Sequence, residues 1–346
     1  MQPWTDWPAA FAGRRDMDMR RFSREAREEI GFHAFVQFLF FEQWEKLRDY
    51  AHRHGIRIIG DLPLYVAHDS ADCWAHRSDF LLDADGRPLL MAGVPPDYFS
   101  ATGQLWGNPV YDWRYQTDTH FGWWVERVRH SVKMFDLLRV DHFRGLAAYW
   151  AVPFGERTAK NGKWYSAPGR LLLKTLEREL GPLPLIAEDL GVITSDVESL
   201  RDEFHLPGMK ILQFGFDSSE ESDFLPHNYR RNCVVYTGTH DNDSVVGWYH
   251  AAKPADREFA REYLGADDGN DVAWSFIRAA WGSVADTAIV PLQDALGLDG
   301  EARMNLPGTL SGNWQWRYKE DMLTPALARK LARLTTLYGR QACDTK

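Results

Sequence analysis

The 346 residues are enough for one large domain or two ordinary ones, and a hydrophobic fraction of 45% can build a sizeable core. The formal net charge of −9 argues against a nucleic-acid partner, because affinity for the phosphate backbone comes mostly from Lys and Arg. The start of the chain lacks a signal-peptide pattern and no apolar run could span a bilayer. The three cysteines, Cys73, Cys233 and Cys343, are not spaced as metal ligands or redox pairs, so we expect a cytoplasmic protein.

Apolar residues alternate between helical spacing and short runs rich in β-branched residues. Ser195 and Glu198 have the spacing of a capping box, which predicts a helix start at residue 195. Helices are expected over residues 14–30, 41–55, 121–135, 170–181, 195–204, 271–281 and 323–339. Six strands are expected to begin near residues 57, 137, 184, 209, 233 and 286.

Repeated strand–helix units predict an α/β fold, with a parallel sheet and helices outside it. The stretch 67–119 is longer than an ordinary connection and rich in Gly, Pro and Asp, so we expect a functional insertion there. No linker or low-complexity segment divides the rest, which favours a single domain over residues 1–346.

Three of the expected strands end in acidic residues: Asp141, Glu188 and Asp241. In a (β/α) barrel, active sites form at the carboxyl ends of the strands, so we expect these carboxylates to converge. For each residue alone, the competing interpretation is a cap on the next helix, which is common for an acidic residue after a strand. Three such residues on separate strands favour a catalytic site.

Arg139 lies two residues before Asp141, so both side chains point to the same face of the strand. A guanidinium there holds Asp141 ionised, as a nucleophile requires, whereas Glu188 in a less polar wall would serve as a proton donor. Asp241 and His240 could then bind sugar hydroxyls, and the 15 Trp residues also suit sugar binding. A metal site is the weaker alternative, since no H-x-H or H-E-x-x-H pattern occurs, and no G-x-S-x-G motif supports a serine hydrolase.

Long stretches of the chain resemble the 4-α-glucanotransferases of glycoside hydrolase family 77, also called amylomaltases or disproportionating enzymes. The similarity extends from about Trp7 to Gly339. The matching stretches are HAFVQFLFFEQW, IIGDLPLYVAHDSADCWA, AGVPPDYFSATGQLWGNPVYDW, RVDHFRGLAAYW, LIAEDLGVIT, PGMKILQFGF, YTGTHDND, RMNLPG and GNWQWR.

The resemblance implies a role for each carboxylate in a retaining double displacement on α-1,4-glucans, without a cofactor or metal. Asp141 matches the family nucleophile, Glu188 the general acid/base, and Asp241 the carboxylate that binds sugar hydroxyls and stabilises the transition state. Other positions are expected to bind maltooligosaccharides or to cover them on the acceptor side: Asp61, Tyr98, Phe99, Trp106, Arg139, His240 and Asn313.

The resemblance also implies a (β/α)8 TIM-barrel type, of which six strands are recognised here, beginning with the family's third. The family's N-terminal region has no counterpart, so two sheet edges are expected to lack partners. One interpretation is a glucanotransferase whose other strands come from a second polypeptide or are absent only from the recorded sequence. The alternatives are a non-catalytic fragment and an α-glucan hydrolase.

Overall fold

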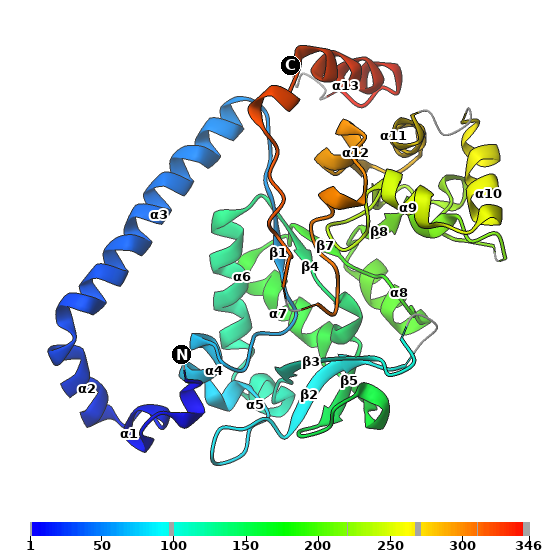
Figure 1. Ribbon diagram of the computed structural model, residues 1–346. Helices are drawn as coiled ribbons and strands as arrows, with labels where there is room; N and C mark the ends of the chain where they lie inside the picture. Colours follow the sequence, from blue (N-terminus) through cyan, green and yellow to red (C-terminus); the bar gives the residue numbers. More distant parts are fainter. Residues whose placement is uncertain (1, 97–99, 220, 267–270, 310, 342–346) are drawn as a thin grey trace. The chain divides into compact units, whose positions relative to one another are not determined.

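The computed structural model describes residues 2–96, 100–219, 221–266, 271–309 and 311–341. The chain divides into two compact units, Met1–Leu206 (unit 1) and Pro207–Lys346 (unit 2). Each unit contains a parallel sheet of three short strands flanked by helices (Figure 1). Strands are present at all six positions where the sequence predicts them.

The parallel sheet of unit 1 has the order β1-β4-β7, with β1 at Ile59–Leu62, β4 at Leu137–Val140 and β7 at Leu185–Ala187. Asp61 on β1 stands beside Arg139 on β4 in the register. The sheet shares one hydrophobic core with three helices, as expected for parallel strands, which are normally covered by helices. These helices are α6 (Gly122–Met134), α7 (Gly169–Leu180) and α8 (Ser195–Glu203).

Strand β1 packs closely against the residue that leads from α6 into β4. A Cβ atom at Gly60 would lie 2.2 Å from the ring of Phe135, so a side chain has no room at this position. Only glycine therefore lets the strand and the ring approach so closely.

A second sheet of unit 1 is antiparallel, and its order is β3-β2-β5-β6. It combines β2 and β3, which lie within 67–119, with two strands that follow β4 in the chain. Its strands are β2 (Leu90–Val94), β3 (Gln104–Pro109), β5 (Ala148–Pro153) and β6 (Lys163–Ser166). The stretch 67–119 also contains two short helices, α4 (Ala71–Ala75) and α5 (Trp113–Asp118).

The N-terminal helices of unit 1 are α1 (Ala9–Ala12), α2 (Asp16–Glu25) and α3 (Arg27–Arg53). Two expectations are wrong here: the segment 14–30 is two helices separated at Ala26, and the helix expected at 41–55 begins at Arg27. The apolar run 31–41 contains no Pro and simply continues the helix. None of the 27 residues of α3 is buried.

The predicted capping box at Ser195 and Glu198 is wrong, because Ser195 is the first helical residue of α8 and the cap position belongs to Thr194. The Thr194 hydroxyl donates to Asp196 and accepts from Arg144, so it makes no bond to a backbone amide of the first turn. Bonds to two side chains, Asp196 in the first turn and Arg144 outside the helix, thus replace the backbone cap.

The parallel sheet of unit 2 has the order β10-β9-β8, with β8 at Gly208–Ile211, β9 at Cys233–Tyr236 and β10 at Thr287–Ile289. Phe216 and Phe276 anchor one hydrophobic cluster of this unit. Its helices are α9 (Val245–Ala251), α10 (Pro254–Leu264), α11 (Val272–Gly282), α12 (Leu292–Leu296) and α13 (Pro325–Leu337). Across the described part of the chain, no helix has the length and apolar character needed to cross a membrane.

Candidate active site

In unit 1, Arg139 connects two of the predicted site carboxylates. Its Nε and Nη2 atoms each donate to one oxygen of Asp61 at 2.8 Å, and Nη2 also donates to Oδ1 of Asp141 at 3.1 Å. Burial alone would lower the pKa of Arg139, but its hydrogen bonds and charge interaction with Asp61 outweigh that effect and raise it. The guanidinium is 11% exposed, so this positive charge is fixed beside Asp141.

The alternation of strand side chains explains this arrangement. Arg139 is on β4, Asp141 follows directly after the strand, and the amide of Asp141 donates to the carbonyl of Leu62 at 3.0 Å. Side chains at residues 139 and 141 therefore point to the same face, where Asp61 of the neighbouring strand also lies.

Glu188 follows β7 and is held by two backbone amides. The amide of His142 donates to Oε2 at 2.6 Å, and the amide of Leu190 donates to Oε1 at 3.0 Å. Burial and the negative charge of Asp141 nevertheless raise the pKa of Glu188 to about 8, against the opposing effects of these amides and of Arg139. Glu188 is therefore a carboxyl group that keeps its proton near neutral pH, next to the carboxylate of Asp141.

The backbone of His142 has an unusual conformation, which directs its own amide toward Glu188. Its φ of 51° lies in the left-handed region, which a residue with a side chain rarely adopts. The imidazole stands edge-on to Trp106, with ring centroids 4.8 Å apart, and burial followed by the charge of Arg144 lowers the pKa of His142 to about 4. A neutral ring at this position adds no charge beside Glu188.

In unit 2, the segment after β9 presents His240 and Asp241. The side-chain amide of Asn305 donates to Oδ1 of Asp241 at 2.6 Å, and Arg303 donates to the backbone carbonyl of Asp241 at 2.5 Å. The amide of Asn305 also donates to the carbonyl of His240 at 3.0 Å. The Asp241 side chain is 47% exposed, so it remains accessible to a ligand.

Asn313 lies in a loop of unit 2 and is engaged in bonds within that loop. Its Oδ1 accepts from the amide of Leu306 at 2.9 Å, and its Nδ2 donates to the hydroxyl of Thr309 at 2.9 Å. The next residue, Trp314, is 53% exposed and its ring lies 5.1 Å from that of His240. Asn313 thus shapes the loop that carries Trp314 to His240.

Trp106 on β3 is 38% exposed and lies against His142, whereas Tyr98 and Phe99 lie outside the described residues. Four contributors to the site were missed from the sequence: the amides of His142 and Leu190, and the side chains of Asn305 and Trp314. Asn305 and Trp314 occur in the motifs RMNLPG and GNWQWR, so the motifs were visible, but their contacts to residues 240 and 241 are not local in sequence.

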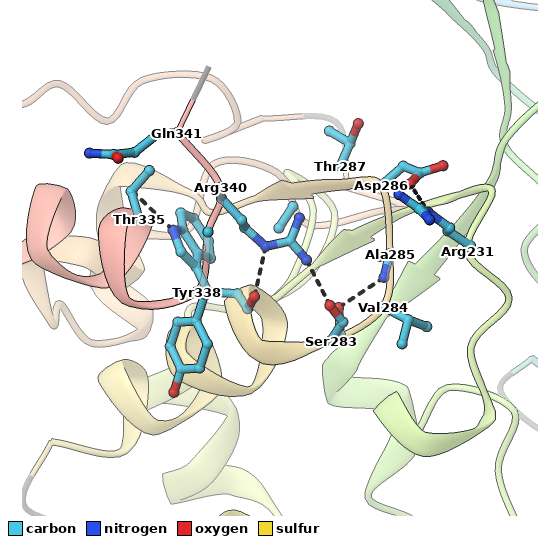
Figure 2. Close-up of a pocket in the computed structure, with 13 residues that line it drawn as sticks. Arg231, Ser283, Val284, Ala285, Asp286, Thr287, Thr335, Tyr338, Arg340 and Gln341 are labelled. Atoms are coloured by element: carbon cyan, nitrogen blue, oxygen red, sulfur yellow. Dashed lines mark hydrogen bonds and ion pairs between the residues drawn. The ribbon is translucent and has the colours of Figure 1, made fainter. Parts of the chain in front are cut away.

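A cavity of about 690 Å³ in unit 2 is lined by none of the predicted site residues (Figure 2). It is bordered by Arg231, just before β9, and Asp286, just before β10, which form an ion pair at 2.9 Å. Arg340 donates to the carbonyls of Trp281 and Ser283 at 2.7 and 2.9 Å and so closes the end of α11. The cavity thus borders the amino ends of these strands, and the catalytic groups of such folds occupy the carboxyl ends.

Known proteins of one family resemble the chain over almost its whole length. The model of the 4-α-glucanotransferase family, glycoside hydrolase family 77, matches residues 1–324. The chain is 51% identical to a 4-α-glucanotransferase of Synechocystis over 345 residues, which are 99% of this chain and 68% of that protein. It is 45% identical to the 4-α-glucanotransferase of Clostridium butyricum, covering 97% of this chain and 70% of that protein.

A solved structure gives the same result. The amylomaltase of Streptococcus agalactiae in complex with acarbose matches with a TM-score of 0.95 and 39% identity, over 98% of this chain and 69% of that one. These relatives do not favour the interpretation as a hydrolase or a non-catalytic chain. The α/β chain, with its buried glutamic acid beside an arginine-paired aspartate, belongs to the 4-α-glucanotransferase family.

Proposed function

We propose that this chain is a 4-α-glucanotransferase that moves α-1,4-glucan segments between maltooligosaccharides by retaining double displacement. The observation that carries the proposal is the contrast between two adjacent carboxyl groups in unit 1. Asp141 is paired with Arg139 at 3.1 Å, whereas burial raises the pKa of Glu188 to about 8. One ionised and one protonated carboxyl group are what retaining glycosidic cleavage needs.

In the first step, Asp141 attacks the anomeric carbon of the donor while Glu188 gives its proton to the departing glycosidic oxygen. The glycosidic bond breaks and a covalent glucosyl ester forms on Asp141. In the second step, Glu188, now ionised, takes the proton of an acceptor 4-hydroxyl, whose oxygen displaces Asp141. The α configuration is retained and Glu188 regains its proton.

We propose that Asp241 and His240 of unit 2 complete the site by binding sugar hydroxyls. The bond from Asn305 to Asp241 supports this role, because it fixes one carboxylate oxygen and leaves the other available to a ligand. In this proposal both units belong to one catalytic barrel over residues 1–346.

The inserted stretch 67–119, including Trp106, is proposed to form the acceptor side, and Asp61 and Asn313 are proposed to bind the glucan. Tyr98 and Phe99 are assigned to this side by the family resemblance alone. Exclusion of water by such a cover favours transfer over hydrolysis. We propose a cytoplasmic location, where maltooligosaccharides are the substrates and no metal or cofactor takes part.

The test is incubation of the purified protein with maltotriose, followed by separation of the products. Glucose together with a ladder of longer maltooligosaccharides supports glucanotransfer. Glucose and maltose without longer products would indicate a hydrolase, and unchanged maltotriose would indicate a non-catalytic chain.

A further inference from the structure

A buried carboxyl group of unit 2, Asp294 on α12, takes no part in the reaction steps described above, yet it bonds to both ends of one segment. The side chain is fully buried, and each of its oxygens accepts one hydrogen bond. The hydroxyl of Thr237 donates to Oδ2 at 2.6 Å, and the amide of Val245 donates to Oδ1 at 2.7 Å. Thr237 directly follows β9 and Val245 begins α9, so one carboxyl group holds the two ends of the segment 237–245.

Gln213, which follows β8, connects the same segment a second time. Its backbone amide donates to the carbonyl of Thr237 at 3.4 Å, and its side-chain amide donates to the carbonyl of Asp243 at 2.9 Å. A Cβ atom at Gly238 would lie 2.7 Å from Nε2 of Gln213, so the segment packs directly on this side chain. Two buried side chains from separate elements therefore each reach both ends of the segment.

Between its ends, the segment forms a compact turn around Asp241. The amide and the hydroxyl of Thr239 donate to Oδ1 of Asn242 at 2.9 and 2.8 Å, and the amide of Asn242 donates to the carbonyl of Thr239 at 3.2 Å. A turn with such internal bonds moves as one body. The place of the Asp241 carboxylate is therefore set by what holds the ends of the segment.

Helix α12 also supports the other segment that contacts Asp241. Gln293, the neighbour of Asp294, donates to the carbonyl of Ala302 at 3.2 Å. The next residue, Arg303, donates to the backbone carbonyl of Asp241 at 2.5 Å. Helices α12 and α9 lie side by side in Figure 1, where Asp294 accepts from the first amide of α9. Two adjacent residues of α12 thus hold both segments that meet at Asp241.

The chemistry of the carboxyl group suits this task. Burial raises the pKa of Asp294 to about 6, against the bonds from Thr237 and Val245, and the charge of Asp243 raises it further. The group is therefore ionised at neutral pH, and both oxygens act as acceptors. Because hydrogen bonds to an ionised acceptor are roughly twice as strong as neutral ones, Asp294 is the stronger of the two holds on the segment.

We propose that Asp294 is a positioning residue that fixes the segment 237–245 at both ends and thereby sets the place of the Asp241 carboxylate. It touches no substrate and acts through Asp241. The inference rests on the proposed function, because it concerns how Asp241 binds the sugar in the transition state. The competing interpretation is that Asp294 only stabilises the start of α9.

The first test is Asp294→Asn, which keeps the shape of the side chain and removes its charge. With maltotriose as substrate, kcat should fall by about 10- to 100-fold with little change in KM, because a small misplacement of Asp241 weakens its contacts in the transition state. In the Asp241→Asn background, the same substitution should cost less than about threefold, since residues that act together are not additive. An unchanged kcat, or an equal loss in both backgrounds, overturns the proposal.

A second pair of variants isolates the bond from Thr237. Thr237→Val removes the hydroxyl at nearly constant volume, and Thr237→Ser keeps it. We expect kcat to fall in Thr237→Val and to recover in Thr237→Ser. An equal loss in both would mean that packing of the methyl group matters and not the bond to Asp294, which contradicts the proposal.

The matched control is Asp256→Asn. Asp256 on α10 of the same unit also accepts from a hydroxyl and a backbone amide, both of Ser218, at 2.6 and 3.0 Å. Its substitution should leave kcat unchanged, with all rates measured below the Tm of every variant. A loss equal to that of Asp294→Asn would mean that any such substitution in unit 2 lowers the rate, and it overturns the proposal.

Amide hydrogen exchange of the free protein separates this inference from the proposed function, because it needs no catalysis. Exchange in residues 238–245 should be faster in Asp294→Asn by at least about tenfold and unchanged in Asp256→Asn. If the unaltered chain transfers nothing but this difference is found, the proposed function fails and the hold of Asp294 on the segment stands. If the chain transfers glucan and exchange does not differ, the function stands and the positioning role is wrong.

Discussion

Both units place an acidic side chain beyond the central strand of a parallel sheet, Asp141 directly after β4 and Asp241 in the segment after β9, but the partners of the two carboxylates differ. In unit 1, Arg139 spans Asp61 and Asp141, and burial raises the pKa of Glu188 to about 8. In unit 2, Asp241 is half exposed and its main side-chain partner is the neutral amide of Asn305. This difference in partners is why the mechanism proposed above assigns the reacting groups to unit 1 and the binding of sugar hydroxyls to unit 2.

The largest effect is expected from Asp141→Asn, which should lower transfer by at least about 10⁴-fold because the nucleophile is lost. Initial rates of glucose release from maltotriose measure it. The control is Asp61→Asn, which also removes a carboxylate from Arg139 but leaves the nucleophile, and should cost roughly tenfold, the loss of one charge-assisted hydrogen bond. Equal losses in the two variants would mean that both carboxylates act only by holding Arg139.

Glu188→Gln should lower transfer by about 10²–10⁴-fold, the usual contribution of general acid–base catalysis. A glycosyl fluoride donor needs no proton on its leaving group, so it should restore formation of the covalent intermediate in this variant. Mass spectrometry of the intact protein detects that intermediate. Asp141→Asn should form none, and its appearance there would contradict the assignment of the nucleophile.

The raised pKa of Glu188 predicts that both the activity and the stability contributed by this group fall as the pH rises. Because the acid form is needed first, kcat/KM should fall as the pH rises through about 8.

The same shift predicts how the free energy of unfolding depends on pH. The pKa of Glu188 is higher in the folded than in the unfolded chain, so the folded state binds the proton more tightly. The stability that this proton contributes is lost as the pH rises from about 4.5 to about 8. Calorimetry should show that the Tm of Glu188→Gln rises relative to the Tm of the unaltered chain between pH 5 and 9. A difference in Tm that stays constant over this range would argue against the raised pKa.

A smaller effect is expected in unit 2. Asp241→Asn should reduce kcat about 10²–10³-fold, as removal of one group that stabilises a transition state does. Asn305→Ala should act in the same direction but more weakly, since it only frees the Asp241 carboxylate. If Asn305→Ala changes KM alone, the hydrogen bond from Asn305 to Asp241 does not stabilise the transition state.

The smallest effect is expected from Trp106→Ala. An aromatic contact is worth about 0.5–1.5 kcal/mol, so the KM for the acceptor should rise by up to roughly tenfold while kcat for the first step stays constant. Initial rates at varied acceptor concentration and fixed donor concentration distinguish a change in the KM for the acceptor from a change in kcat for the first step. Trp164→Ala is the control, because Trp164 on β6 is also exposed, at 40%, and has no proposed role.

Local patterns in the sequence predicted the strands of the two parallel sheets but not the four strands of the antiparallel sheet. The strand ends and the motifs selected the acidic residues for which we propose catalytic roles. The pairing of Arg139 with Asp141 followed from the two-residue period of a strand. The amide of His142 on Glu188 could not be predicted, because it depends on a φ of 51° and on a contact across 46 residues. The length of α3 was underestimated because strongly apolar residues suggest burial, and here they are exposed.

The close packing at Gly60 connects the far end of the sheet to the reacting groups. Phe135 lies two residues before β4, the strand that carries Arg139 and ends just before Asp141. A single methyl group at residue 60 would push on this ring and shift the start of that strand. The geometry of the guanidinium and its carboxylates thus depends on the absence of one carbon atom at a buried position of the neighbouring strand.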